Sequence, residues 1–195
     1  MRVTARVEKG GDAKAVLQPT LDAIYSRLGE YIYSDDGGKL PQTAAALMDK
    51  RGVTVAAAES LTGGLVCSML VDVPGMSAHL KEGVVAYSNE AKVRLGVLPE
   101  TLEKYTAVSE QTALELAKAV RLRAGTDIGV STTGVAGPGP DSDGNPEGLA
   151  FAGISTKDGE RAVRIETGGS RDRIRYYTAL CAIDEIRKYL KERAD

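Results

Sequence analysis

Residues 53–64 restrict the fold of this chain more than any other stretch, because an apolar run ends there in a polar, glycine-rich turn. The run from Val53 to Ala58 is typical of a buried strand, and the sequence Glu-Ser-Leu-Thr-Gly-Gly follows it directly. A helix-like apolar stretch, residues 65–71, comes next. Strand, tight turn and helix form the repeating unit of α/β folds. The pattern therefore places a hydroxyl group where a helix begins.

The hydroxyls of this turn, Ser60 and Thr62, have two interpretations. Either hydroxyl can simply cap the helix by accepting hydrogen bonds from its first backbone N–H groups. The same N–H groups and the helix dipole also favour a bound anion, or a nucleophile beside an oxyanion hole. The turn alone leaves both interpretations open.

Strand-like and helix-like segments alternate along most of the chain. This alternation predicts an α/β fold, a three-layer α/β/α sandwich with a mostly parallel sheet. We expect strands at residues 53–58, 84–88, 128–133, 149–155 and 162–167, the last two joined as a hairpin through Asp158-Gly159. We expect helices at residues 42–50, 64–71, 90–95, 110–123 and 172–192, a loop around Pro99, and Ser109 as an N-cap.

The first 38 residues differ from the rest and predict a small βαβ-like appendage. We expect a strand from Arg2 to Val7, a helix from Ala13 to Leu28, a strand from Tyr31 to Tyr33 and a linker at residues 34–38. These few elements can bury little apolar surface by themselves. We therefore divide the chain into residues 1–38 and a main domain, residues 39–195.

Composition excludes several classes of protein. Hydrophobic residues make up 43% and charged residues 27% of the 195 residues, as in globular proteins. The formal net charge is -2 and no long basic tract is present, which disfavours a nucleic-acid partner. No apolar run reaches the roughly 18 residues of a membrane span. The N-terminus lacks an apolar signal core, so we expect a cytoplasmic protein without a membrane partner.

Histidine and cysteine are scarce, which limits the possible chemistry. His79 is the only histidine, so a Ser-His-Asp triad would need that residue, which we interpret as a surface side chain. Cys67 and Cys181 lie far apart within apolar helical patterns, and we expect buried free thiols. We therefore expect no metal site and no cofactor.

A serine nucleophile at residue 60 would need a base, and the candidates are Lys92, Tyr87 and Glu59. A lysine acts as a base only when its pKa falls well below about 10.4. Lys92 lies in the first turns of an expected helix, where the dipole lowers the pKa of a lysine. The alternatives are a solvated lysine, a half-buried structural tyrosine, and a glutamate that anchors the turn through backbone or arginine hydrogen bonds.

Several motifs occur in a characteristic order, at residues 56–64, 87–92, 95–97, 107–110, 133–139, 146–148 and 171–175. Together they resemble the C-terminal domain of the competence/damage-inducible protein CinA family, over roughly residues 40–190. That family includes nicotinamide-nucleotide amidases, which hydrolyse the carboxamide of nicotinamide mononucleotide (NMN). Residues 1–33 resemble the end of the small subdomain that precedes this domain in full-length CinA proteins. This sequence shows no resemblance to the large N-terminal domain of those proteins, which carries a pyrophosphatase activity, so we expect either a naturally short form or a fragment.

The resemblance implies roles for individual residues. Ser60 matches the serine nucleophile, Lys92 its lysine partner and general base, and Tyr87 a tyrosine that relays or orients a proton. Thr133 matches an active-site threonine. The residues expected to bind substrate are Glu59, Thr62, Gly63, Gly64, Thr133, Gly134, Ala136, Gly137, Arg171 and Arg175.

Two expectations depend on the physical chemistry of the site as well as on the resemblance. Glycines let the backbone approach a ligand closely, so the N–H groups of residues 62–64 could stabilise an oxyanion or hold a substrate oxygen. Arg171 and Arg175 begin the last helix and could bind phosphate in a bidentate manner. The alternative for both arginines is a solvated basic face that pairs with Asp172 and Glu166.

The chain departs from the family at two places. Thr106 stands where glycine is usual, and the loop at residues 140–145 reads Pro-Asp-Ser-Asp-Gly-Asn where the family often carries more glycine. These differences leave the contacts of the loop open.

The resulting hypothesis is a metal-independent amidohydrolase with a small-molecule nucleotide as substrate. Ser60 would attack the carboxamide of NMN, ammonia would leave, and water would release nicotinate mononucleotide. We also expect a homo-oligomer, a dimer. Two alternatives remain: a catalytically silent CinA-type module that binds a nucleotide or a partner in DNA uptake or damage responses, and a Ser/Lys hydrolase of another small amide.

Overall fold

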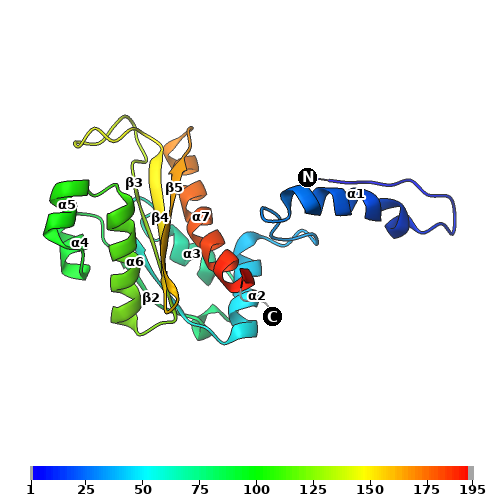
Figure 1. Cartoon of the computed structure of the whole chain (residues 1–195), viewed down its shortest axis with the longest axis horizontal. Helices are drawn as coiled ribbons and strands as arrows, with labels where there is room; N and C mark the ends of the chain where they lie inside the picture. The colour runs from blue at the N-terminus through cyan, green and yellow to red at the C-terminus, as the bar shows by residue number, and fades with distance from the viewer. Residues whose placement is uncertain (1, 193–195) are drawn as a thin grey trace. The chain divides into compact units, whose positions relative to one another are not determined.

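The computed structural model describes residues 2–192, which separate into two compact units between Gly38 and Lys39. The first unit contains the helix α1 (Ala13–Leu28) (Figure 1). The Asp12 carboxylate caps this helix by accepting hydrogen bonds from two backbone N–H groups of its first turn. The βαβ-like arrangement is wrong, because neither residues 2–7 nor residues 31–33 form a strand. No side chain of α1 is buried, so this unit lacks the packed apolar core that short strands need for stability.

The second unit is built on a five-stranded sheet with the order β2-β1-β3-β4-β5. β1 pairs in parallel with β2 and β3, whereas β4 is antiparallel to both β3 and β5. β4 therefore runs against the other four strands, and the sheet is mostly parallel, as predicted. The strands are β1 (Val55–Glu59), β2 (Leu80–Val85), β3 (Ile128–Gly134), β4 (Leu149–Thr156) and β5 (Gly159–Glu166).

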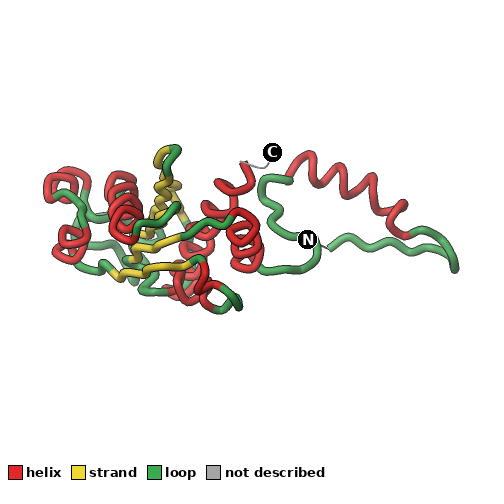
Figure 2. The backbone as a smooth tube through the Cα atoms, turned by 90° about the horizontal axis from the view of Figure 1, so that it is seen from below, coloured by secondary structure: helices red, strands yellow, loops and turns green. Residues whose placement is uncertain are grey.

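Helices cover both faces of this sheet and form a three-layer α/β/α sandwich, as predicted (Figures 1 and 2). One face packs against α6 (Glu110–Ala124), with α4 (Asn89–Leu95) and α5 (Pro99–Tyr105) beside it. The other face is covered by α2 (Leu40–Arg51), α3 (Leu65–Val71) and α7 (Arg171–Glu192), and a short 3₁₀ helix, η1 (Met76–Ala78), precedes β2. No helix within residues 2–192 is long and apolar enough to span a membrane.

The central strand β1 contributes to the apolar core on both faces of the sheet. Val55 and Ala57 belong to the cluster under α2, α3 and α7, while Ala56 and Ala58 belong to the cluster under α6. Successive side chains of a strand point to opposite faces, so a strand buried on both sides reads as one continuous apolar run. This explains why the sequence 55–58 contains no polar residue.

Two elements differ from the expectations. β2 runs from Leu80 to Val85, so it begins four residues before the predicted strand at residues 84–88. The apolar run did not reveal its first half, because β2 is an edge strand that includes the charged Lys81 and Glu82. The apolar run continues past it to Ala86, whose N–H still donates to the carbonyl of Glu59. The predicted loop around Pro99 is the helix α5, which starts at this proline, a residue that suits the first helical position.

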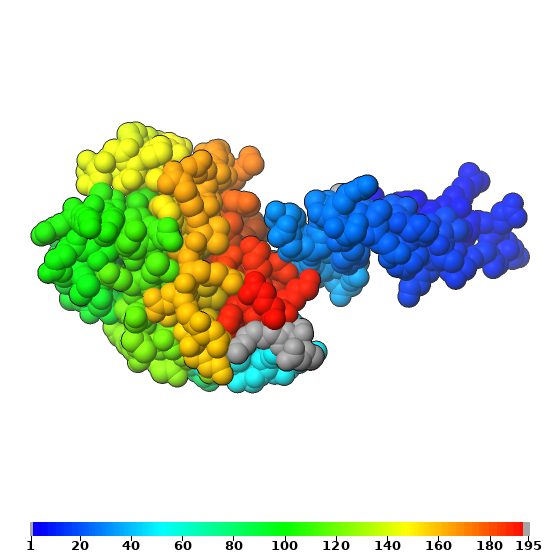
Figure 3. All heavy atoms as spheres, viewed as in Figure 1, coloured from blue at the N-terminus to red at the C-terminus, as the bar shows by residue number. Residues whose placement is uncertain are grey.

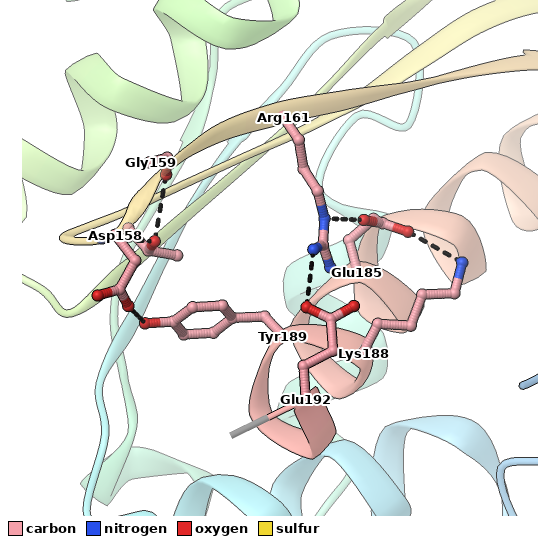
Figure 4. A network of polar contacts seen from close by, with 8 residues as sticks. Asp158, Gly159, Arg161, Glu185, Lys188, Tyr189 and Glu192 are labelled. Carbon is pink, nitrogen blue, oxygen red and sulfur yellow. Dashed lines mark hydrogen bonds and ion pairs between the residues drawn. The ribbon is translucent and has the colours of Figure 1, made fainter. Parts of the chain in front are cut away.

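Polar contacts fasten the C-terminal end of α7 to the turn between β4 and β5 (Figure 4). The Tyr189 hydroxyl donates to the Asp158 carboxylate at 2.6 Å. Arg161 donates through Nε to the buried Glu185 carboxylate at 2.8 Å, and Lys188 donates to the same group at 3.0 Å. This network lies at the end of the sheet opposite to the carboxyl ends of β1 and β3, so it stabilises the fold away from the residues considered below.

Candidate active site

The turn after β1, the segment after β2 and the loop after β3 meet at the carboxyl ends of these three parallel strands. β1 ends at Glu59, which is paired with Val85 of β2 and Thr132 of β3, so these parallel strands end side by side. Ligands of open α/β sheets bind at this edge. A pocket of about 390 Å³ opens there, within the size range of small-molecule sites. The predicted site residues that line it are Ser60, Tyr87, Lys92, Thr133, Gly134, Ala136 and Arg171.

Ser60 and Lys92 are in direct contact at the base of this pocket. Lys92 is in α4, whose N-cap Ser88 accepts a hydrogen bond from Ala91 N, and only 2% of its surface is exposed. Its Nζ lies 3.2 Å from the Ser60 hydroxyl oxygen, 3.0 Å from the Ala86 carbonyl oxygen and 2.9 Å from the Tyr87 carbonyl oxygen. The lysine nitrogen therefore has three neutral oxygen atoms as hydrogen-bond partners.

Burial lowers the pKa of Lys92 to about 8, and the nearby negative charge of Glu90 opposes this shift only in part. A neutral amine has two N–H groups and one lone pair. When the carbonyls of Ala86 and Tyr87 accept the two N–H bonds, the lone pair is directed at the Ser60 hydroxyl. Neutral Lys92 is therefore positioned to accept the hydroxyl proton of Ser60 near pH 8.

Glu59 holds the turn that carries Ser60. Its carboxylate is 1% exposed and accepts hydrogen bonds from the backbone N–H groups of Gly64 at 2.9 Å, Val66 at 3.0 Å and Cys67 at 2.9 Å. It therefore caps α3, and the interpretation of Ser60 or Thr62 as the cap is wrong. Since these N–H groups bind Glu59, they are not directed at a ligand.

Thr62 and Arg175 also contact the turn. The Thr62 hydroxyl lies 2.6 Å from the hydroxyl of Thr132, and Arg175 donates to the carbonyl oxygens of Leu61 at 3.0 Å and Thr62 at 2.8 Å. A set of residues predicted to bind substrate is absent from the pocket lining: Glu59, Thr62, Gly63, Gly64, Gly137 and Arg175. In the structure, the contacts of Glu59, Thr62 and Arg175 fix the position of the turn.

Arg171 lies on the other side of the pocket, at the start of α7. It donates to the Gly137 carbonyl oxygen through Nη1 and lies 3.4 Å from the Tyr87 hydroxyl through Nη2. The Tyr87 side chain is 61% exposed, and its hydroxyl contacts Arg171 and not Ser60 or Lys92 in the part of the chain described. Thr133 donates its hydroxyl to the Ala107 carbonyl oxygen at 2.5 Å.

Part of the pocket lining was not found from the sequence. Asn89 and Ser88 adjoin the motif at residues 87–92, which could have indicated them. Asp141, Ser142 and Asp143 belong to the loop segment that was noted only as a departure from the family. The lining residues missed in all are Leu61, Ser88, Asn89, Ala107, Val108, Asp141, Ser142 and Asp143.

Thr106 adopts an unusual backbone conformation next to this pocket, with φ 66° and ψ 174°. This region is occupied almost only by glycine because a Cβ is strained there. The Thr106 hydroxyl accepts hydrogen bonds from Val108 N and Asn145 Nδ2, both at 3.3 Å. Ser109 caps α6 as predicted, by accepting a hydrogen bond from Thr112 N at 3.2 Å.

The remaining nucleophile candidates are unsuited to the role. Burial, with the nearby charge of Glu59, raises the pKa of Cys67 to about 12, and burial raises that of Cys181 to about 11. The interpretation of His79 as a surface residue is wrong, because it is buried with Nδ1 2.8 Å from the Val53 carbonyl oxygen. Residues 2–192 contain no group of three or more His, Cys, Asp or Glu side chains that could hold a metal ion.

Two larger hollows occur at the opposite end of the sheet. One of about 450 Å³ is lined by Asp158, Arg161 and Tyr189, and one of about 680 Å³ by Arg51 and Lys157 among others. Both lie where β3 and β5 begin, far from Ser60. The smaller pocket is the better candidate because it places a serine hydroxyl in contact with a lysine amine whose pKa is lowered to about 8.

Comparison with known proteins identifies the family of this chain. Residues 38–190 match the CinA C-terminal domain family. The chain belongs to this family. It is 44% identical over 191 residues to a CinA-like protein of Kosmotoga olearia, which covers 97% of this chain and 46% of that protein. The chain thus spans about half the length of the curated relatives it matches.

Solved structures of CinA-type proteins share the fold. A competence/damage-inducible protein from Agrobacterium tumefaciens is 35% identical, with a TM-score of 0.72, over 79% of this chain and 96% of that one. A competence or damage-inducible protein from Enterobacter asburiae is 32% identical, with a TM-score of 0.75, over 77% of this chain and 96% of that one. Each similarity thus covers more than three quarters of this chain.

Proposed function

We propose that this domain is a metal-independent amidohydrolase that converts NMN and water into nicotinate mononucleotide and ammonia. One observation carries the proposal: Lys92 Nζ lies 3.2 Å from Ser60 Oγ. Its pKa is lowered to about 8. Together the two side chains supply a nucleophile and a base. The substrate follows from the family resemblance of the motifs around them.

In the first step, neutral Lys92 takes the hydroxyl proton of Ser60 as the serine oxygen attacks the carboxamide carbon. A tetrahedral intermediate forms, and its oxygen carries the negative charge. Lys92 then gives the proton to the amide nitrogen, the C–N bond breaks, and ammonia leaves. The product of this half-reaction is an ester between Ser60 and the nicotinoyl group.

In the second step, water attacks the ester, and Lys92, neutral again, takes a proton from it. The C–O bond to Ser60 breaks as the proton returns to the serine oxygen. Nicotinate mononucleotide is released and the side chains regain their starting states. The buried position of Lys92 favours this cycle because a base with a pKa near the working pH can both accept and return the proton.

The oxyanion needs a hydrogen-bond donor beside Ser60. Gly63 N donates to the Ser60 carbonyl and Gly64 N to Glu59, so these two groups are occupied. Leu61 lines the pocket, and its N–H has no acceptor among the described residues. The N–H of the residue after the nucleophile often forms part of an oxyanion hole. We assign the Leu61 N–H this role.

Phosphate binding falls to Arg171, which lines the pocket and has only neutral oxygen partners. An arginine binds phosphate through two parallel N–H groups, and such charge-assisted bonds are stronger than bonds to a carbonyl. Thr133, Gly134 and Ala136 line the same pocket as this arginine and Ser60. Tyr87 orients Arg171 through its hydroxyl and Lys92 through its carbonyl.

The deciding experiment is incubation of the purified chain with NMN, with ammonia and nicotinate mononucleotide as the measured products. We expect turnover that persists in EDTA and is lost in Ser60→Ala. Binding of NMN without ammonia release would favour a silent nucleotide-binding module. Ammonia release from other small amides but not from NMN would favour a Ser/Lys hydrolase of different specificity.

A further inference from the structure

Among the ionisable residues that line the pocket around Ser60, Arg171 and Asp143 have opposite charges that do not neutralise each other. Arg171 and Asp143 both line it, yet neither forms a salt bridge with the other or with any residue of the described chain. The partners of Arg171 are the Gly137 carbonyl and the Tyr87 hydroxyl, which are uncharged. A pocket with separate positive and negative groups is suited to a ligand that carries both charges.

Asp143 belongs to a compact segment, residues 141–145, which we call the acidic turn. Asp141 organises this turn: its Oδ1 accepts hydrogen bonds from Asp143 N at 3.0 Å and Asn145 N at 2.8 Å. Its Oδ2 accepts one from Asn145 Nδ2 at 2.9 Å. The Asp141 carboxylate is thus used within the turn. The Asp143 carboxylate has no hydrogen-bond partner in residues 2–192 and remains available to a ligand.

The acidic turn is also attached to the wall of the pocket. Asn145 Nδ2 lies 3.3 Å from the Thr106 hydroxyl, and the residues after Thr106, Ala107 and Val108, line the same pocket. In the space-filling view the loop after β3 lies against the segment that ends α5 (Figure 3). Thr106 makes this contact from a backbone conformation that glycine would adopt without strain. A fixed turn holds its charge in place better than a free loop does.

We propose that Asp143 is a specificity-determining residue that recognises a positive charge on the substrate, while Arg171 recognises the anionic group. The two residues would thus bind opposite charges of the substrate proposed above. This inference rests on the proposed function and deepens it. In NMN the ring nitrogen carries the glycosidic bond and a permanent positive charge, and the phosphate supplies the negative one. Arg171, the cation that lines the same pocket, forms no salt bridge with Asp143 in residues 2–192.

The test compares NMN with benzamide mononucleotide, in which carbon replaces the charged ring nitrogen and the phosphate is retained. The wild-type chain, Asp143→Asn and Asp143→Glu are assayed for KM and kcat with NMN, and for the Ki of benzamide mononucleotide as a competitor. We expect Asp143→Asn to raise KM for NMN roughly two- to fivefold, the range for an exposed charge pair, with kcat and Ki unchanged. Asp143→Glu keeps the charge and should restore much of the affinity.

Two controls make the outcome specific. Asp72→Asn removes an exposed aspartate at the end of α3, outside the pocket, and should change neither constant. Raising the salt concentration should shrink the difference between wild type and Asp143→Asn, because mobile ions screen exposed charges.

The failure of this inference is distinguishable from failure of the proposed function. Suppose that wild type releases ammonia from NMN, but that Asp143→Asn raises KM for NMN and Ki for benzamide mononucleotide by the same factor, or changes neither constant. The charge role of Asp143 is then wrong, and the proposed amidase activity stands. If wild type releases no ammonia from NMN, the proposed function fails and this inference fails with it.

Discussion

The side-chain nitrogen of Lys92 lies 3.2 Å from the hydroxyl oxygen of Ser60. The carbonyls of Ala86 and Tyr87 hold it at 3.0 and 2.9 Å, one from each of two consecutive residues after β2. These contacts leave the lysine one direction in which a lone pair can point, and that direction is the serine. A pair built in this way needs neither histidine nor a carboxylate to activate the nucleophile.

We predict that Ser60→Ala abolishes ammonia release from NMN and leaves the fold intact. The hydroxyl is the proposed nucleophile, and its loss removes one hydrogen bond with Lys92, which costs about 1 kcal/mol of stability. Ammonia release and thermal unfolding measure the two effects. Ser142→Ala is the matched control, because Ser142 lines the same pocket and should retain turnover. Substantial turnover by Ser60→Ala would point to direct attack by water.

The pH dependence of kcat/KM should follow the protonation of Lys92. Its pKa is lowered to about 8, and only the neutral amine can accept the serine proton. We expect kcat/KM to rise about tenfold per pH unit below this value and to level off above it. Lys92→Met should lower kcat far more than it raises KM, because a general base acts mainly in the transition state. A rise in KM alone would make Lys92 a binding residue.

The lowered pKa of Lys92 also predicts how the free energy of unfolding depends on pH. Its folded pKa, about 8, lies below the ordinary value of 10.5, so the unfolded chain binds more protons between these values. The free energy of unfolding therefore receives a contribution that rises with pH across this window, by up to about 1.4 kcal/mol per unit. Lys92→Met should lack this contribution. Chemical denaturation of both proteins at pH 7 to 10.5 measures the difference.

Much of the fold could be predicted because local patterns and tertiary packing agree. The long helices α6 and α7 and the hairpin of β4 and β5 lie within a few residues of their predicted bounds. β2 was misplaced because an edge strand contains charged residues, so the apolar run marks only part of it. The strands expected before and after α1 do not form, since a strand depends on a partner that the local sequence does not specify.

The sequence predicted which loops form the site. It did not predict which of their side chains line the pocket and which only hold the turn in place. Parallel strands bring the segments around Ser60, Lys92 and Thr133 to one edge, which the order of elements already implied. The sequence could not show that the Glu59 carboxylate occupies the N–H groups of α3, because that depends on the direction of one buried side chain. It likewise gave no sign that Asp143 faces the pocket.

Thr106→Gly should be more stable than Thr106→Ala, the reverse of the usual order for glycine and alanine. Thr106→Ala keeps the strained backbone and loses the hydroxyl contacts with Val108 N and Asn145 Nδ2, so we expect a loss of about 1 kcal/mol. Thr106→Gly loses the same contacts but relieves strain of about 1–3 kcal/mol. Glycine should therefore be the more stable of the two variants in chemical denaturation. The usual order, with alanine more stable, would show that the positive φ carries no strain.

Glu59→Gln should destabilise the domain and slow catalysis together. The carboxylate accepts hydrogen bonds from Gly64, Val66 and Cys67, and an amide oxygen can replace only part of this. Hydrogen bonds to a charged group are worth roughly 1.5–3 kcal/mol, so we expect a loss in that range. kcat should fall because the turn positions Ser60. Glu82→Gln, which removes a half-exposed partner of Arg123 on β2, is the control and should leave kcat unchanged. A Glu59→Gln protein with normal stability would contradict the capping role.

Substitutions of Arg171 and Arg175 should have different effects when NMN is compared with nicotinamide riboside, which lacks the phosphate. Arg171 lines the pocket, whereas Arg175 donates to the carbonyls of Leu61 and Thr62 and holds the turn. Arg171→Ala should lower kcat/KM for NMN roughly ten- to a hundredfold, as expected for a charge-assisted bond, with little effect on the riboside.

Arg175→Ala should instead lower kcat for NMN and riboside by the same factor, because it disturbs Ser60 and not the phosphate. The ratio of kcat/KM between nucleotide and nucleoside is thus the decisive number: large in wild type and Arg175→Ala, small in Arg171→Ala. An equal ratio in all three proteins would mean that neither arginine binds phosphate, and a substrate without that group would then fit the pocket better.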